Sequence, residues 1–116
     1  MQIAWKECFC DKYLEIIAIR LYNLDDQNFF LKAYQQISNQ SRALHCALFK
    51  MKTIPGAWSI HLWWPISSEE PSKSSEAVCI SEQLRDMGLV HHVVCTPMNE
   101  SAIAGTPSGE STTKIT

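Results

Sequence analysis

The chain has 116 residues, of which 46% are hydrophobic and 19% charged, and its net charge is −2. This size and composition predict a single globular domain with a substantial core, and the slight acidity argues against a nucleic-acid partner. No apolar run is long enough to cross a membrane and the N-terminus lacks the pattern of a signal peptide. We therefore expect a cytoplasmic protein without a membrane partner.

The first half of the chain predicts an arm, a strand and a helix. Residues 1–12 form the N-terminal arm, and the segment YLEIIAIRLY (13–22), apolar nearly throughout, is typical of a central strand. Residues 23–40 then change to a helical period, with large side chains at Phe29, Phe30, Ala33, Tyr34 and Ile37. Asp25 or Asp26 is expected to supply the N-cap and the negative charge of the first turn.

A hairpin is predicted in the middle of the chain. In HCALFKMKT (45–53), Ala47, Phe49 and Met51 alternate with Leu48, Lys50 and Lys52, as in a strand. Pro55 and Gly56 suit the centre of a type II turn. The segment WSIHLWW (58–64) alternates again and completes the hairpin, and Pro65 ends it.

The second half predicts a helix, a strand and a tail. After a polar loop, a helix is expected from about Ser74 to Met87, with an apolar stripe at Ala77, Ile80, Leu84 and Met87. Gly88 is the expected C′ residue of that helix. The segment LVHHVVCT (89–96) predicts the last strand, and residues 99–116 are too poor in large apolar side chains to pack, so a flexible tail is expected.

This order of elements predicts an α+β fold, the ferredoxin-like βαββαβ arrangement. Right-handed crossovers would place both helices on one face of a four-stranded antiparallel sheet, with strand order 4-1-3-2. The domain is expected to span residues 13–98, between the arm (1–12) and the tail (99–116).

The five cysteines do not predict a disulfide framework, because their number is odd and no secretion signal precedes them. Cys46, Cys79 and Cys95 fall in apolar segments and are expected to be buried free thiols. Cys8 and Cys10 lie in the arm, and their role is left open. Zinc usually takes four ligands in paired spacings, which this chain lacks, so neither a metal nor a cofactor is expected.

The alternation of the two central strands predicts which side chains face away from the helices. Ile17, Ile19 and Leu21 are expected under the helices, together with Trp58, Ile60, Leu62 and Trp64. The opposite face would then carry Leu14, Ile16, Ala18, Arg20, Tyr22, Ser59, His61 and Trp63, joined by Leu48 and by either Val93 or Val94. Such a face is too apolar to meet water. A second copy is the simplest cover, so we expect a homodimer whose sheets pack face to face.

The pattern resembles the dimeric α/β-barrel superfamily and, within it, the antibiotic biosynthesis monooxygenase-like group, over roughly Tyr13 to Met98. The resemblance is carried by the order of elements, the apolar open face and the tryptophan-bearing third strand that leads to the helix SSEAVCISEQL (74–84). It implies a homodimeric α/β barrel and monooxygenase-like activity on an aromatic or quinone-like compound.

The candidate site residues are polar groups on this apolar face, the composition of a small-molecule cavity. His61 and Arg20 are the candidate catalytic residues, because an imidazole can move a proton near neutral pH and a guanidinium can hold an anion. Tyr22, Trp63, Ser59 and His92 are the candidate ligand contacts, although the strand pattern leaves open whether His91 or His92 faces the cavity.

Two functions therefore remain open from the sequence. One is an enzyme with a small apolar cavity that binds an apolar or aromatic ligand. The other is a non-catalytic ligand-binding or assembly protein, in which the open face serves association, Arg20 pairs at the rim and His61 is a hydrogen-bonded interface residue. The discriminating observation is whether Arg20 and His61 converge on an enclosed volume.

Overall fold

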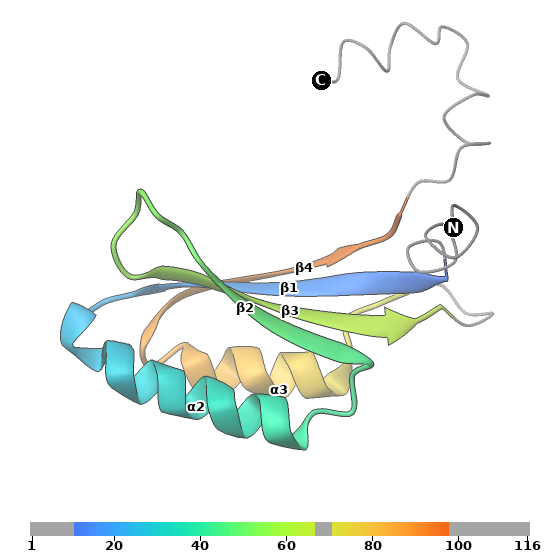
Figure 1. The fold of residues 1–116 in the computed structure, drawn as a ribbon, viewed down its shortest axis with the longest axis horizontal. Helices are drawn as coiled ribbons and strands as arrows, with labels where there is room; N and C mark the ends of the chain where they lie inside the picture. Colours follow the sequence, from blue (N-terminus) through green and yellow to red (C-terminus); the bar gives the residue numbers. More distant parts are fainter. Residues whose placement is uncertain (1–10, 67–70, 98–116) are drawn as a thin grey trace, which may run out of the picture.

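A computed structural model describes residues 11–66 and 71–97, which fold into two layers (Figure 1). In chain order the elements are β1 (Lys12–Leu21), the 3-10 turn η1 (Leu24–Asp26), α2 (Gln27–Gln40), β2 (His45–Lys50), β3 (Ala57–Pro65), α3 (Ser75–Leu84) and β4 (Gly88–Cys95). The antiparallel sheet has the order β2-β3-β1-β4, which is the predicted order read from the other edge. The predicted ferredoxin-like arrangement is confirmed. The predicted tail, and the predicted arm up to Cys10, lie outside the described residues.

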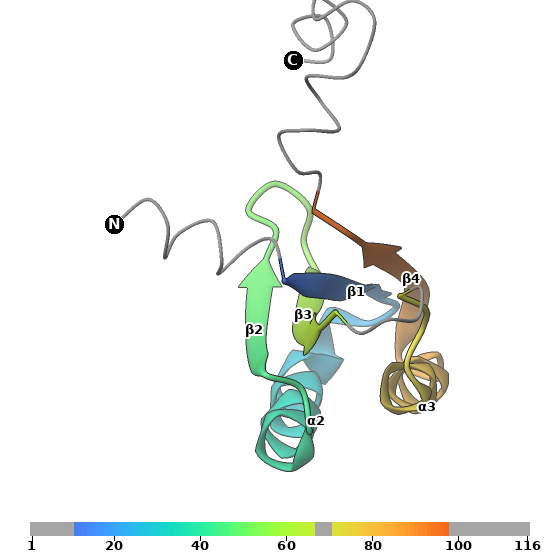
Figure 2. The same ribbon diagram turned by 90° about the vertical axis from the view of Figure 1, so that its right-hand side faces the viewer.

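The core lies between the sheet and the two helices, which both cover the same face (Figures 1 and 2). The strands contribute Ile17, Ile19, Leu21, Trp58, Ile60 and Leu62, and the helices contribute Phe30, Ala77, Ile80 and Leu84. Trp64 packs against this core from the end of β3. The face predictions for both central strands are thereby confirmed. In the described part of the chain, no helix is both long and apolar enough to span a membrane.

The helix starts differ in how they are capped. Asn23, not an aspartate, supplies the side-chain cap before α2: its Oδ1 accepts from the backbone N of Asp25 at 2.9 Å. Asp26 is the N-cap residue of α2 but makes no side-chain capping bond. The predicted N-cap position is therefore confirmed at Asp26, but the side-chain capping bond is made one turn earlier, by Asn23 at the start of the preceding 3-10 turn. Ser74 caps α3, and its Oγ accepts from the backbone N of Ala77 at 3.1 Å.

Two glycines serve different purposes. Gly56 has φ +78°, and the backbone N of Ala57 donates to the carbonyl of Ile54 at 3.2 Å, so the predicted type II turn is confirmed. Gly88 is not a C′ residue in a left-handed conformation, as predicted, but the first residue of β4. A Cβ at this position would lie 2.3 Å from the carbonyl oxygen of Arg20, so the close approach of β4 to β1 requires glycine.

The burial predicted for the cysteines is wrong in part. Cys46 is half-buried, whereas Cys79 and Cys95 are exposed, and all three are free thiols. Cys79 faces the groove between the helices and Cys95 ends the edge strand β4. Cys79 and Cys95 both lie outside the core between the sheet and the helices. They are therefore exposed, although their neighbours in the sequence are apolar.

Candidate functional site on the open sheet face

The strand register defines the face that the helices leave uncovered, and we call it the open face. Its side chains are Lys12, Leu14, Ile16, Ala18 and Arg20 from β1, His45, Ala47 and Phe49 from β2, Ala57, Ser59, His61, Trp63 and Pro65 from β3, and Leu89, His91, Val93 and Cys95 from β4. The two central strands place the predicted residues Arg20, Ser59, His61 and Trp63 together on this face.

The edge strands correct the predicted membership of the open face. Leu48 lies opposite Ile60 and packs against the core, so its predicted place on the open face is wrong. Ala47 and Phe49 occupy that face instead, because a shift of one residue moves a side chain across the sheet. On β4, Val93 pairs with Ile16 and belongs to the open face, whereas Val94 pairs with the buried Glu15.

The two adjacent histidines of β4 point to opposite faces. His91 pairs with Ala18 and lies exposed on the open face. His92 pairs with Ile17, and its side chain is only 5% exposed on the helix side. His92 therefore does not join His61 as the predicted ligand contact. Tyr22 lies beyond the end of β1 and is 66% exposed, so it does not line the open face either.

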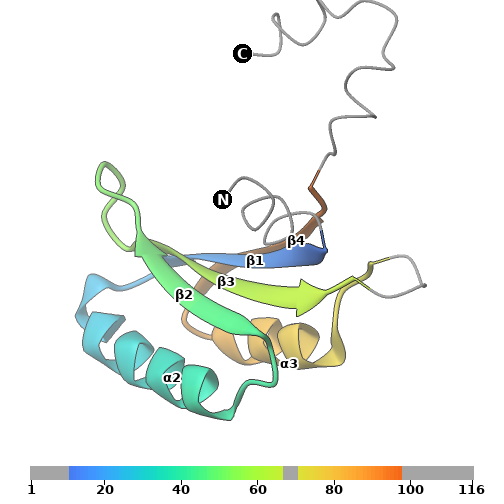
Figure 3. The same cartoon turned by 45° about the vertical axis from the view of Figure 1, so that its right-hand side comes forward.

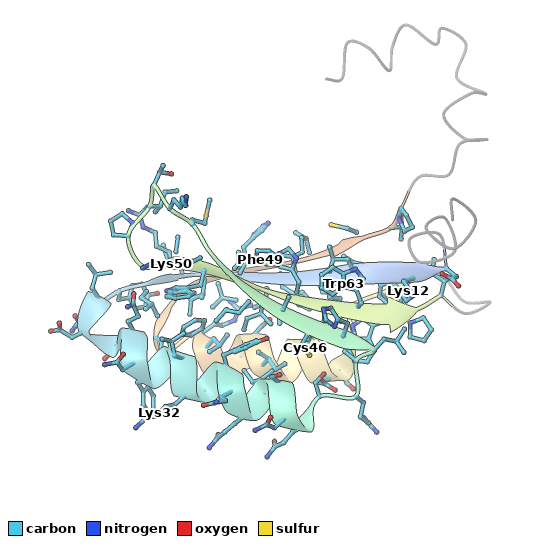
Figure 4. All side chains as sticks on the ribbon, viewed as in Figure 1. Lys12, Lys32, Cys46, Phe49, Lys50 and Trp63 are labelled. Atoms are coloured by element: carbon cyan, nitrogen blue, oxygen red, sulfur yellow. The ribbon has the colours of Figure 1, made fainter. Side chains whose placement is uncertain are left out.

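A row of aromatic rings crosses β2 and β3 on the open face, and Figure 4 labels two of its members, Phe49 and Trp63. The ring centroids of His45 and Trp63 lie 5.2 Å apart, those of Trp63 and His61 lie 5.8 Å apart, and those of His61 and Phe49 lie 4.5 Å apart. These tilted contacts lie within the range that aromatic pairs prefer, and they hold the imidazole of His61 between two apolar rings.

His61 is suited to accept a proton. Burial lowers the pKa of its imidazole below the usual value, so the ring is neutral at pH 7. Its Nε2 lies 3.1 Å from the hydroxyl of Ser59, which fixes the ring plane. The residues directly opposite it across the strands are Ala47 and Ile16.

Arg20 shares the face with His61 but does not touch it. It lies four positions along β1 from Ile16, the residue opposite His61, which corresponds to about 13 Å along the strand. Between them Ala18 and Ser59 pair directly, flanked in the same row by His91 and Phe49. These small side chains form a shallow floor, which we call the Ala18–Ser59 floor. Arg20 and His61 thus stand at opposite ends of the Ala18–Ser59 floor and do not converge on an enclosed volume within one chain.

A second polar cluster, which the sequence did not predict, lies under the helices. Glu15 is fully buried in β1, and its carboxylate accepts from the backbone N of Ser74 at 2.8 Å and from the Ser74 hydroxyl at 2.6 Å. The Nε2 of His92 lies 2.8 Å from the same carboxylate. The signal in the sequence is a glutamate inside an apolar strand, at the period of the core positions Ile17 and Ile19.

Two hollows accompany these clusters. A pocket of about 230 Å³ opens at one end of the open face, between Tyr13, Leu14, Trp63 and Pro97. Figure 3 shows that α2 and α3 lie on the same side of the sheet. A larger groove of about 590 Å³ runs between them, with apolar walls that include Ile37 and Ile80 and polar margins at Arg42, Glu76 and Gln83. Within residues 11–66 and 71–97, no three histidine, cysteine or carboxylate side chains come close enough to hold a metal ion.

The order and register of these elements define the class: a ferredoxin-like α+β domain whose sheet leaves one face open. The chain is similar in structure to SnoaB, a cofactor-independent oxygenase from Streptomyces nogalater, with a TM-score of 0.52 and 9% identity over 77% of this chain and 95% of that chain. A variant of SnoaB gives the same values. At this identity the likeness shows the fold alone, and it confirms the fold that the sequence resemblance implies. No family model and no curated protein matches the sequence.

Proposed function

We propose that the protein is a homodimeric, monooxygenase-like enzyme that acts without a cofactor on a small aromatic or quinol-like compound at the open face. The observation that carries the proposal is the half-buried imidazole of His61, which is neutral at pH 7 and lies between the rings of Phe49 and Trp63. The fold shared with a cofactor-independent oxygenase supports the reaction class.

His61 is the proton acceptor in this proposal. When its Nε2–H donates to the Ser59 hydroxyl, Nδ1 carries a free lone pair and can take a proton from an activated CH₂ group of the substrate. The resulting carbanion gives one electron to dioxygen, and recombination of the two radicals forms a C–O bond. The peroxide anion takes a proton back from His61, and loss of water leaves a carbonyl group. In total, the CH₂ group and O₂ become a carbonyl group and water.

The open face also needs a cover for this chemistry. Phe49 and Leu89 are 50% and 64% exposed there, beside the half-buried Leu14, Ile16 and Val93. A second copy of the sheet would bury this apolar surface and would keep water away from the carbanion. The enclosed volume that one chain lacks would then form between the two sheets.

The first test measures oxygen consumption with a panel of anthrones, which carry the activated CH₂ group that the proposed step requires. His61→Asn should lower kcat about 100-fold or more, the usual range for loss of a general base, and should leave the fold intact. Because burial lowers the pKa of His61, wild-type activity should stay constant through neutral pH and fall only below about 6.5, where the imidazole gains a proton.

Gln83→Ala, in the groove between the helices, is the matched control and should keep full activity. The proposal is wrong if His61→Asn retains its rate. If the rate is lost in Gln83→Ala instead, the larger groove is the site. If the wild-type protein dimerises but consumes no oxygen with any of these compounds, the alternative function in association is favoured.

A further inference from the structure

We propose that the open face selects aromatic compounds that carry an anionic group, with Arg20 as the residue that recognises the anion. The ring of the ligand would lie on the Ala18–Ser59 floor, its anionic group at Arg20 and its reacting end at His61. The inference rests on the proposed function because it concerns the same face. Its test measures ligand binding, so it does not require the enzyme to turn over a substrate.

The charges on the open face differ from those of the chain as a whole. The whole chain has 12 acidic and 10 basic residues. Among the described residues, the strands place Lys12, Arg20, His45, His61 and His91 on the open face and no carboxylate, and Asp11 lies only at its rim, beside Lys12. The one acidic residue within β1, Glu15, points to the helix side and is fully buried there. A face that combines cationic and imidazole groups without acids favours an anionic ligand over a neutral one.

In the part of the chain that the structure describes, no acceptor pairs with Arg20. Among the described residues its guanidinium makes no hydrogen bond or ion pair, whereas Lys12, at the other end of β1, lies 3.7 Å from Asp11. A guanidinium that is covered by a second sheet needs an acceptor for its donors, and a carboxylate matches its fork geometry. Within the described strands, a second copy of the open face brings no carboxylate to Arg20, so an anionic ligand is a group that can supply the acceptor.

The distance between Arg20 and His61 along the sheet suits a ligand of two fused rings. From the Ala18–Ser59 floor, Arg20 is two residues along β1 in one direction, and His61 is two residues along β3 in the other. The strand geometry puts their Cα atoms about 14 Å apart. The imidazole of His61 reaches over the floor to within 3.1 Å of the Ser59 hydroxyl, and an arginine side chain at position 20 is long enough to reach it from the other end. The gap between them would fit a fused two-ring system with its acidic group and its hydroxyl at opposite ends. Phe49 and His91 bound the same floor on either side.

The test compares two fluorescent probes that differ in one group, 6-hydroxy-2-naphthoate and 2-naphthol. The dissociation constant of each is measured at pH 7.5 for the wild-type protein and for Arg20→Ala. We expect the naphthoate to bind the wild-type protein about 10-fold or more tightly than naphthol, the usual effect of a charge-assisted hydrogen bond. Arg20→Ala should abolish this preference and leave the affinity for naphthol unchanged, and Arg20→Lys should restore part of it.

Arg42→Ala is the matched control, because Arg42 lies at the groove between the helices. It should bind both probes as the wild-type protein does. Equal affinity of the wild-type protein for the two probes, no binding of either, or a preference that is lost in Arg42→Ala would each overturn the inference. An Arg20-dependent preference without oxygen consumption would support the inference and count against the proposed oxygenase function.

Discussion

Trp58 and Trp63 lie on the same strand, β3, but on opposite faces of the sheet. Trp58 is 8% exposed under the helices, and its ring centroid lies 5.5 Å from that of Phe30. Trp63 lies on the open face between His45 and His61. Trp58→Ala should therefore lower the free energy of unfolding by about 3–5 kcal/mol through cavity formation, as measured by urea denaturation. Trp63→Ala should cost less than half as much and should weaken ligand binding or dimerisation instead. A larger loss of stability in Trp63→Ala would contradict the face assignment.

At the scale of elements, the carboxylate of Glu15 joins β1, β4 and the start of α3. It serves two donors of Ser74 and lies within hydrogen-bond distance of His92. Glu15→Ala would leave these buried groups without their partner, so the free energy of unfolding should fall by about 3–5 kcal/mol. Glu15→Gln, which keeps one acceptor oxygen, should lose less, and Glu82→Ala on the exposed side of α3 should change little. Denaturation curves for Glu15→Ala and Glu82→Ala that coincide would show that the cluster does not hold α3 in place.

At the scale of the whole molecule, the open face is the expected dimer interface. Ile16 lies at its centre on β1, between His61 and Val93. Ile16→Asp would bury two symmetry-related charges without partners, so the dimer should dissociate into folded monomers. Val78→Asp, which changes an exposed apolar residue on α3, is the control and should remain dimeric. Sedimentation velocity at micromolar concentration distinguishes the two, and a monomeric wild-type protein would rule out this mode of assembly.

The sequence by itself determined the order of elements, the sheet order and the faces of the two central strands. These features follow from local signals: the period of two in WSIHLWW, the helical stripe from Ala77 to Met87 and the Pro55–Gly56 turn. The predicted faces are correct because helices cover one side of β1 and β3. Along each of these strands, the side chains that alternate toward the helices are therefore the buried ones.

Only the tertiary structure decided the residues at the edges and the pairing of buried polar groups. Leu48 and His92 each stand in a strand whose alternation is equally compatible with either face, and pairing with Ile60 and Ile17 settles it. The partners of Glu15 come from segments 59 and 77 residues away, and no local pattern encodes such a contact. The sequence predicts that Gly88 ends a helix. The structure shows instead that glycine is required there because a Cβ would collide with the carbonyl of Arg20 on the neighbouring strand. Periodicity is a property of one segment, whereas register and close approach depend on two.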